Sequence, residues 1–213
     1  MFGNKKIAML LAELVGTAVL ALVFIGVQRT GIGYPFFIAL AAGLAVGAMA
    51  MVFGATSGAH FNPALTLGLW TARKVKTIPA ILYIAVQILG GAIAFWTYNF
   101  LAKTHIASMS GHYGARIMIG EAIGVFVFVI GWTAAATQKF EGLKLAATVG
   151  GSFALGIIIA SLASYGFANP AIALADNSFG WSTYVLGAAI GGVVGVNFYK
   201  YLLAGTVKAK AKK

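Results

Sequence analysis

The tripeptide Asn-Pro-Ala occurs twice in this sequence, as Asn62-Pro63-Ala64 and as Asn169-Pro170-Ala171. Asparagine is a favourable N-cap and proline suits the first position of a helix, so each copy predicts the start of a short helix. The cap uses the amide oxygen of the asparagine and leaves its NH2 group to donate to a passing molecule. Two such helix starts can therefore hold the oxygen of a water or a hydroxyl group.

The segments that follow the two tripeptides are too short to cross a bilayer. Residues 63–72 would form a helix of roughly 15 Å, which is about half of the hydrocarbon thickness. Two half-helices that enter from opposite sides would point their positive dipole ends at the same place in the midplane. That field disfavours cations, including hydronium, whereas neutral solutes can pass.

The composition is that of an integral membrane protein. Hydrophobic residues make up 61% of the chain and charged residues 9%, with a mean hydropathy of +0.93, whereas a soluble domain carries roughly a quarter of charged residues. Long apolar runs predict an all-α membrane protein with six transmembrane helices and two half-helices, within residues 57–72 and 165–180. The six spans are expected at about residues 7–28, 34–55, 78–101, 116–138, 145–164 and 181–203.

The two halves of the chain, about residues 1–103 and 112–205, resemble each other in sequence. We expect them to form a single membrane channel domain, 1–213. Glu13 lies in the first predicted span, and Glu121 lies at the equivalent place in the fourth. Three spans per copy is an odd number, so the second copy enters the membrane upside down. Such an inverted repeat places functional sites near the midplane, at the interface of the two copies.

The distribution of basic residues predicts the orientation. The net charge is +11, but the basic residues lie between the spans and form no stripe, so we expect no nucleic-acid partner. Of the 15 lysines and arginines, all but Arg29, Lys103 and Arg116 fall on the side of the termini. The positive-inside rule therefore predicts a plasma-membrane protein with cytoplasmic termini and a basic tail, 206–213, that is solvated or meets anionic lipid.

Three polar residues of the predicted spans and first loop have two interpretations each. An acid inside a span, such as Glu13 or Glu121, often marks a proton relay or an ion site. The equivalent places of these two acids favour a structural role, in which each accepts hydrogen bonds from the backbone that leads into a half-helix. His60 is interpreted as a histidine that supports the first loop, with a gate or pH sensor as the alternative.

The sequence does not predict an enzyme. It contains no cysteine, no catalytic triad and no phosphate-binding loop. His105 and His112 lack a third partner at metal-ligand spacing. We therefore expect no metal and no cofactor.

Taken together, these features resemble the aquaporin, or major intrinsic protein, family over essentially the whole chain. The motif Ser-Gly-Ala-His-Phe-Asn-Pro-Ala at residues 57–64, the second Asn-Pro-Ala, the paired glutamates and the six spans all match that family. The resemblance implies a homotetramer in the lipid bilayer with one pore in each subunit. It also implies that water and small neutral solutes, sometimes glycerol-like molecules or gases, pass through the pore.

One position departs from the family pattern. The arginine that usually follows the second Asn-Pro-Ala is replaced by Ile172, and the other three constriction positions fall, by spacing, at Ala42, Ile157 and Gly166. The outer constriction is therefore expected to be apolar and wide, unless Tyr165 or Phe167 folds inward. An apolar ring passes solutes with apolar bodies and can also dewet and close.

The sequence favours a passive channel with Asn62 and Asn169 as central donors, and two alternatives stay open. One is an ion-coupled secondary transporter that uses Glu13, Glu121 or Asp176, because inverted repeats and broken helices occur in that class too. The other is a pore closed by its apolar ring, which would leave a structural membrane tetramer.

Overall fold

The computed structural model describes residues 3–30, 32–108, 114–178 and 180–205. His112 and the basic tail lie outside the described residues. Six helical spans surround two half-helices, as predicted, and no strand occurs in the described ranges. The spans are α1 (Asn4–Gln28), α2 (Pro35–Ser57), α4 (Thr77–Ala102), α5 (Ala115–Thr137), α6 (Gly142–Ala160) and a sixth span made of η1 (Trp181–Val185), α8 (Leu186–Phe198) and η2 (Tyr199–Leu203).

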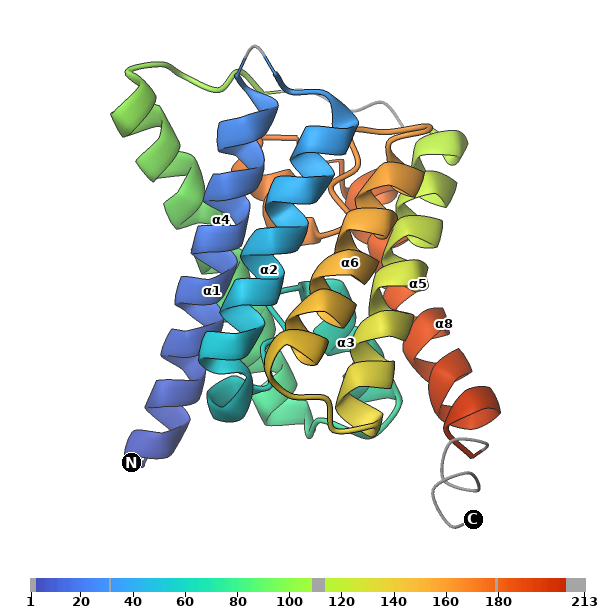
Figure 1. Ribbon diagram of the computed structural model, residues 1–213. Coiled ribbons are helices and arrows are strands. Elements are labelled where there is room, and N and C mark those ends of the chain that lie inside the picture. The colour runs from blue at the N-terminus through green and yellow to red at the C-terminus, as the bar shows by residue number, and fades with distance from the viewer. Residues whose placement is uncertain (1–2, 31, 109–113, 179, 206–213) are drawn as a thin grey trace.

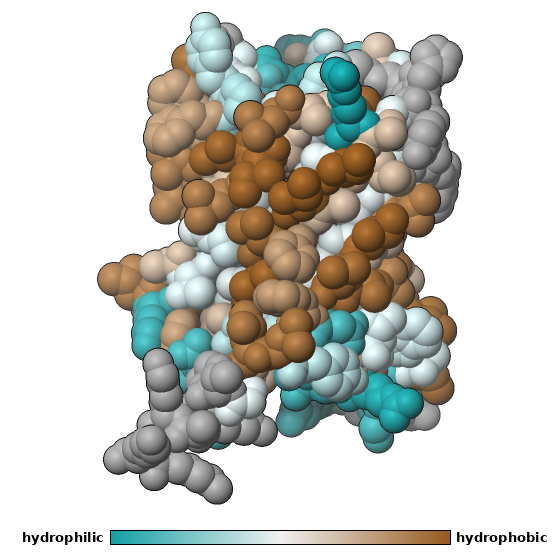
Figure 2. Space-filling view, turned by 90° about the vertical axis from the view of Figure 1, so that its right-hand side faces the viewer, coloured by the Kyte–Doolittle hydropathy of each residue, from teal (hydrophilic) through white to brown (hydrophobic). Residues whose placement is uncertain are grey.

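The spans alternate in direction, and α1 begins at the end of the bundle toward which α8 descends (Figure 1). We call this end the inner face and the opposite end the outer face. Hydrophobic side chains cover the middle of the surface seen in Figure 2, and hydrophilic side chains gather toward its two ends. All six spans are long and apolar enough to cross a bilayer, so the molecule is a multi-pass membrane protein.

The two half-helices are α3 (Pro63–Thr71) and α7 (Pro170–Ala175), of nine and six residues. The fifth span ends at Ala160, four residues earlier than predicted, because a turn follows it before the chain enters the membrane again at Gly166. Gly166 has a φ of +71°, a left-handed conformation that glycine adopts without strain. This turn sets the start of the loop that leads to the second Asn-Pro-Ala.

Glycines allow the helices around the site to pack with their backbones in contact. On α2, a Cβ added at Gly43 would lie 2.7 Å from the carbonyl oxygen of Gly150 on α6. Gly68 of α3 packs in the same way against Gly192 of α8, and Gly91 of α4 packs against Ala171 of α7. Each half-helix is thus held against a full span by backbone contact.

Neighbouring glycines on α6 give a test of this packing. In Gly150→Ala the new methyl group would meet the carbonyl oxygen of Gly43, whereas the space around Gly151 is open. We expect Gly150→Ala to destabilise the fold by about 1–3 kcal/mol because α2 and α6 must separate. Gly151→Ala should instead stabilise it by about 0.5–1 kcal/mol through helix propensity. Thermal unfolding in detergent measures both, and equal melting temperatures would contradict the close contact.

Candidate functional site

The two asparagines cap the half-helices, as the sequence predicts. The Oδ1 atom of Asn62 accepts a hydrogen bond from the backbone N–H of Ala64 at 2.9 Å. The Oδ1 atom of Asn169 accepts from the backbone N–H of Ala171 at the same distance. Both half-helices therefore begin at the centre of the bundle, where their positive dipole ends face each other.

The amide NH2 groups are more constrained than the sequence suggested. Asn62 Nδ2 donates to the carbonyl oxygen of Ala168 at 2.8 Å, and Asn169 Nδ2 donates to that of Phe61 at 2.9 Å. Phe61 and Ala168 share a φ of +48°, so the two loops have matching backbone conformations. The expectation that both NH2 groups are wholly free is therefore wrong, because each uses one hydrogen to join the two repeats, and one hydrogen of each amide remains.

Glu13 holds the first loop from inside α1. Its side chain is fully buried, and its two carboxyl oxygens accept four hydrogen bonds of 2.6–2.9 Å. The donors are the Ser57 hydroxyl, the backbone N–H groups of His60 and Phe61, and the Gln87 amide. These contacts support the structural interpretation of this acid.

Glu121 occupies the equivalent place beneath the second loop. Its carboxyl oxygens accept from the Ser164 hydroxyl at 2.6 Å and from the backbone N–H groups of Phe167 and Ala168 at 3.0 and 2.7 Å. Both loops descend into the membrane with backbone N–H groups that no helix or sheet satisfies, and a buried carboxyl supplies the acceptors.

His60 lies in a closed polar and aromatic environment. Its Nδ1 atom is 3.1 Å from the Thr66 hydroxyl. The rings of Tyr83 and Trp132 pack edge-on against it, each with a centroid distance of 5.2 Å. Only 5% of the residue is exposed. This environment favours a histidine that supports the loop over one that titrates in contact with water.

The four predicted constriction positions lie in the core. Ala42, Ile157 and Ile172 have no exposed surface, and Gly166 is also buried. Phe167 folds inward, with its ring 5.7 Å from that of Phe24 between centroids. None of the four residues carries a polar side chain, and the ring of Phe167 packs against those of Phe24 and Tyr184. The width of the outer constriction stays a prediction. A water molecule reaches these side chains only if their neighbours move.

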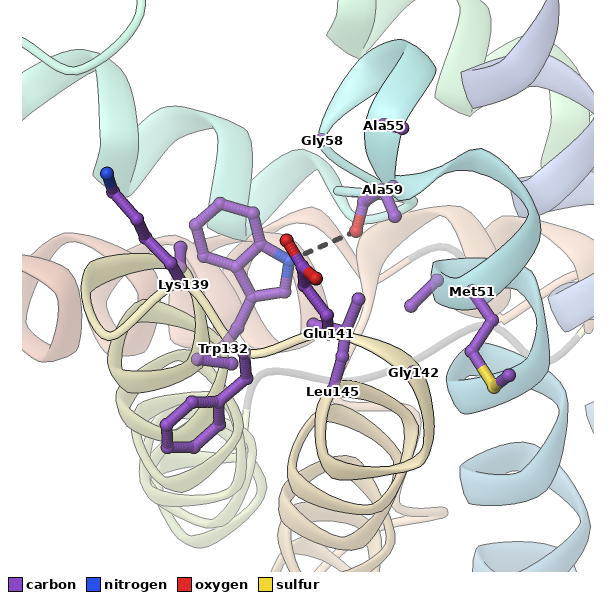
Figure 3. Close-up of a pocket in the computed structure, with 14 residues that line it drawn as sticks. Met51, Ala55, Gly58, Ala59, Trp132, Lys139, Glu141, Gly142 and Leu145 are labelled. Carbon is purple, nitrogen blue, oxygen red and sulfur yellow. Dashed lines mark hydrogen bonds between the residues drawn. The ribbon is translucent and has the colours of Figure 1, made fainter.

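A cavity of about 460 Å³ opens on the inner side of the site, between α2, α5 and α6. Trp132 donates from Nε1 to the carbonyl oxygen of Ala59 at 3.1 Å in its wall (Figure 3). Lys139 and Glu141 line the same cavity. Its lining includes Gly58 and Ala59, from the loop that leads to Asn62, and we call this cavity the inner vestibule. The two asparagines themselves are 1% exposed.

A second cavity, of about 540 Å³, opens on the outer side and contains an ion pair that the sequence did not predict. Arg29 donates from Nε and Nη2 to Oδ1 of Asp176, at 3.1 and 2.6 Å. Asp176 lies beyond α7 and outside the six spans, where burial raises the pKa of its carboxyl and the hydrogen bond from Arg29 opposes that shift. The two residues are 147 positions apart, so no local pattern could have paired them.

Comparisons with known proteins agree with this geometry. The model of the major intrinsic protein family matches residues 3–199. Aquaporin AqpM of Methanothermobacter marburgensis is 31% identical over 195 residues, which cover 81% of this chain and 78% of that protein. Aquaporin Z of Photorhabdus laumondii is 29% identical over 226 residues, which cover 92% and 97%. The X-ray structure of the aquaglyceroporin from Plasmodium falciparum superposes with a TM-score of 0.70 at 21% identity, over 96% of this chain and 99% of that one, and shares its fold.

Proposed function

This chain belongs to the major intrinsic protein family, and from that premise we propose how its pore selects solutes. The protein is a passive membrane channel for water and small solutes, and its family comprises channels rather than enzymes. The observation that carries the proposal is the pair of asparagine caps joined across the repeats. One N–H of Asn62 and one of Asn169 remain as donors, and they orient the oxygen of each solute at the midplane.

The outer constriction is the apolar ring of Ala42, Ile157, Gly166 and Ile172. Because the ring offers no charged or polar side chain, it favours neutral solutes with an apolar body, such as glycerol-like molecules or dissolved gases. The buried ring of Phe167, which packs against Phe24, supports a role of this residue in narrowing the ring. Permeation therefore requires the ring side chains to move apart as the solute passes.

The transporter alternative is less well supported. A coupling site needs a carboxyl that can exchange a proton or an ion, whereas Glu13 and Glu121 accept four and three hydrogen bonds from buried protein groups. Release of either acid would leave those donors unsatisfied, at about 1–3 kcal/mol for each donor. The two acids therefore serve as loop supports, together with His60.

The family and the charge distribution support a proposal for the assembly and the location. We propose a homotetramer in the plasma membrane, with one pore in each subunit and both termini in the cytoplasm. The chain then forms one channel domain of two inverted repeats, and the tail at 206–213 is its basic cytoplasmic end. A pore that stays closed at Ile157 and Ile172 would leave only a structural tetramer.

Substitution of Ile172 tests the apolar ring. Ile172→Arg introduces a guanidinium, which is a charged donor group, into the ring. Asp176 lies one helical turn away on the outer side and offers a carboxyl as its partner. We expect glycerol flux into proteoliposomes to fall about tenfold, because the guanidinium narrows the ring and binds water. Water flux, measured by stopped-flow light scattering, should be retained. Ile172→Met is the uncharged control of similar size, and an equal loss of glycerol flux in that variant would contradict the role of charge.

A further inference from the structure

The second cavity, which we call the outer vestibule, lies one helical turn beyond the apolar ring. Four residues of helix rise about 6 Å, and three vestibule residues are each four positions further out than a ring residue. These pairs are Ile38 with Ala42, Ser161 with Ile157, and Asp176 with Ile172. Polar groups that the ring lacks are therefore present one turn outward, where a solute enters.

Arg29 is held in a fixed position in this vestibule. Two of its N–H groups donate to Oδ1 of Asp176, and the Ser178 hydroxyl donates to Oδ2 of the same carboxyl at 3.0 Å. The side chain of Asp176 is fully buried, whereas that of Arg29 is 30% exposed. A guanidinium carries five N–H donors in one plane, so the carboxyl orients the group and leaves further donors for the vestibule.

Gln28 adds an acceptor to the same cavity. Among the described residues, its Oε1 is the buried side-chain oxygen or nitrogen that has no hydrogen-bond partner, and Gln28 lines the vestibule beside Arg29. A buried acceptor without a partner is costly. The O–H group of a solute both donates and accepts, which is the chemistry that the acceptor of Gln28 and the donors of Arg29 require.

We propose that Arg29 and Gln28 form an outer selection site, in which Arg29 replaces the arginine that is missing at position 172. The guanidinium repels inorganic cations and donates to neutral hydroxylated solutes, and Gln28 accepts from them. Asp176 is a positioning residue, because it acts through Arg29. This inference rests on the proposed channel function and adds to it a charged residue supplied from α1.

A merely structural ion pair would give different results. If the pair only ties α1 to the end of α7, loss of either partner should lower stability in the same way and change no selectivity. If Arg29 is the barrier, the two losses differ, because Arg29→Gln leaves the buried carboxyl of Asp176 facing the vestibule whereas Asp176→Asn leaves the cation in place. A cleft lined by one sign of charge concentrates ions of the opposite sign.

The test measures water flux and sodium flux in proteoliposomes made from the full chain. We expect Arg29→Gln to raise sodium flux about tenfold or more, with water flux within twofold of the wild type. Arg29→Lys, which keeps the charge, and Asp176→Asn should leave sodium flux low. Arg116→Gln removes the same charge from the exposed start of α5 and is the matched control. Size-exclusion profiles identify any variant that fails to fold. The sodium flux of the double variant Arg29→Gln/Asp176→Asn then tests the positive charge of Arg29 without leaving an unpaired carboxyl.

Each outcome separates the two proposals. Sodium flux in Arg29→Gln equal to that in Arg116→Gln would overturn the role of Arg29 and leave the channel intact. Equal rises in Arg29→Gln and Asp176→Asn would also overturn it, because they would indicate local loosening instead of a charge effect. Wild-type water flux no greater than that of empty liposomes would overturn both the channel and the site built on it.

Discussion

Glu13→Leu is expected to abolish the folded protein. The substitution removes the acceptor of four hydrogen bonds from buried donors, among them the backbone N–H groups of His60 and Phe61. Each donor left unsatisfied costs about 1–3 kcal/mol, so the loss is roughly 4 kcal/mol or more. This is comparable with the whole stability of a typical domain, about 5–15 kcal/mol. We expect little monodisperse protein in size-exclusion chromatography, and a much lower melting temperature for any that remains.

The control for this prediction is Glu141→Leu, because Glu141 is an exposed acid at the start of α6. Its substitution changes the same charge and the same volume without affecting a buried donor. We expect its melting temperature to stay close to that of the wild type. Glu13→Leu protein that unfolds at the same temperature as Glu141→Leu would show that Glu13 does not hold the loop.

Ile157→Ala is expected to increase glycerol permeability about tenfold or more, since lowering a barrier by 1.36 kcal/mol gives a tenfold change in rate. Ile157 is fully buried, and in the proposed constriction a solute must displace it to pass. Replacing its side chain with a methyl group lowers the barrier to glycerol permeation on one side of the ring. The same change costs stability, about 2–5 kcal/mol for a buried isoleucine, and the permeability per folded protein is therefore the quantity to compare.

The neighbouring residue supplies the control. Ile158 lies on the same helix and is 38% exposed. Ile158→Ala therefore removes the same atoms at a position outside the proposed ring. Its glycerol permeability should equal that of the wild type. If Ile157→Ala and Ile158→Ala have the same permeability in stopped-flow measurements, Ile157 does not form the constriction.

Local features of the site could be predicted from the sequence. The caps formed by Asn62 and Asn169 follow from residue preferences at helix starts, which involve neighbouring positions only. The six spans follow from apolar length, and the six long apolar helices of the structure agree with them. The equivalent places of Glu13 and Glu121 in the two repeats predict their contacts with the two loops, which the structure contains.

Features that depend on the packing of distant residues could not be predicted. The bond from Asn62 to Ala168 joins residues 106 positions apart, and that from Arg29 to Asp176 joins residues 147 positions apart. Neither pair has a spacing that a helix or loop would favour. The sequence offers Phe167 as a candidate to fold inward, but its position depends on the space left by Phe24 and Tyr184. Single-sequence patterns do not contain that information.

The osmotic water permeability of the wild-type protein tests the central claim most directly. Proteoliposomes and protein-free liposomes of the same lipid are mixed with a non-permeant osmolyte, first without an ion gradient and then with an imposed sodium or proton gradient. A passive channel predicts faster shrinkage than in protein-free liposomes, at a rate that an imposed sodium or proton gradient does not change. Shrinkage at the rate of protein-free liposomes, or solute uptake against its own gradient when an ion gradient is imposed, would contradict a passive channel.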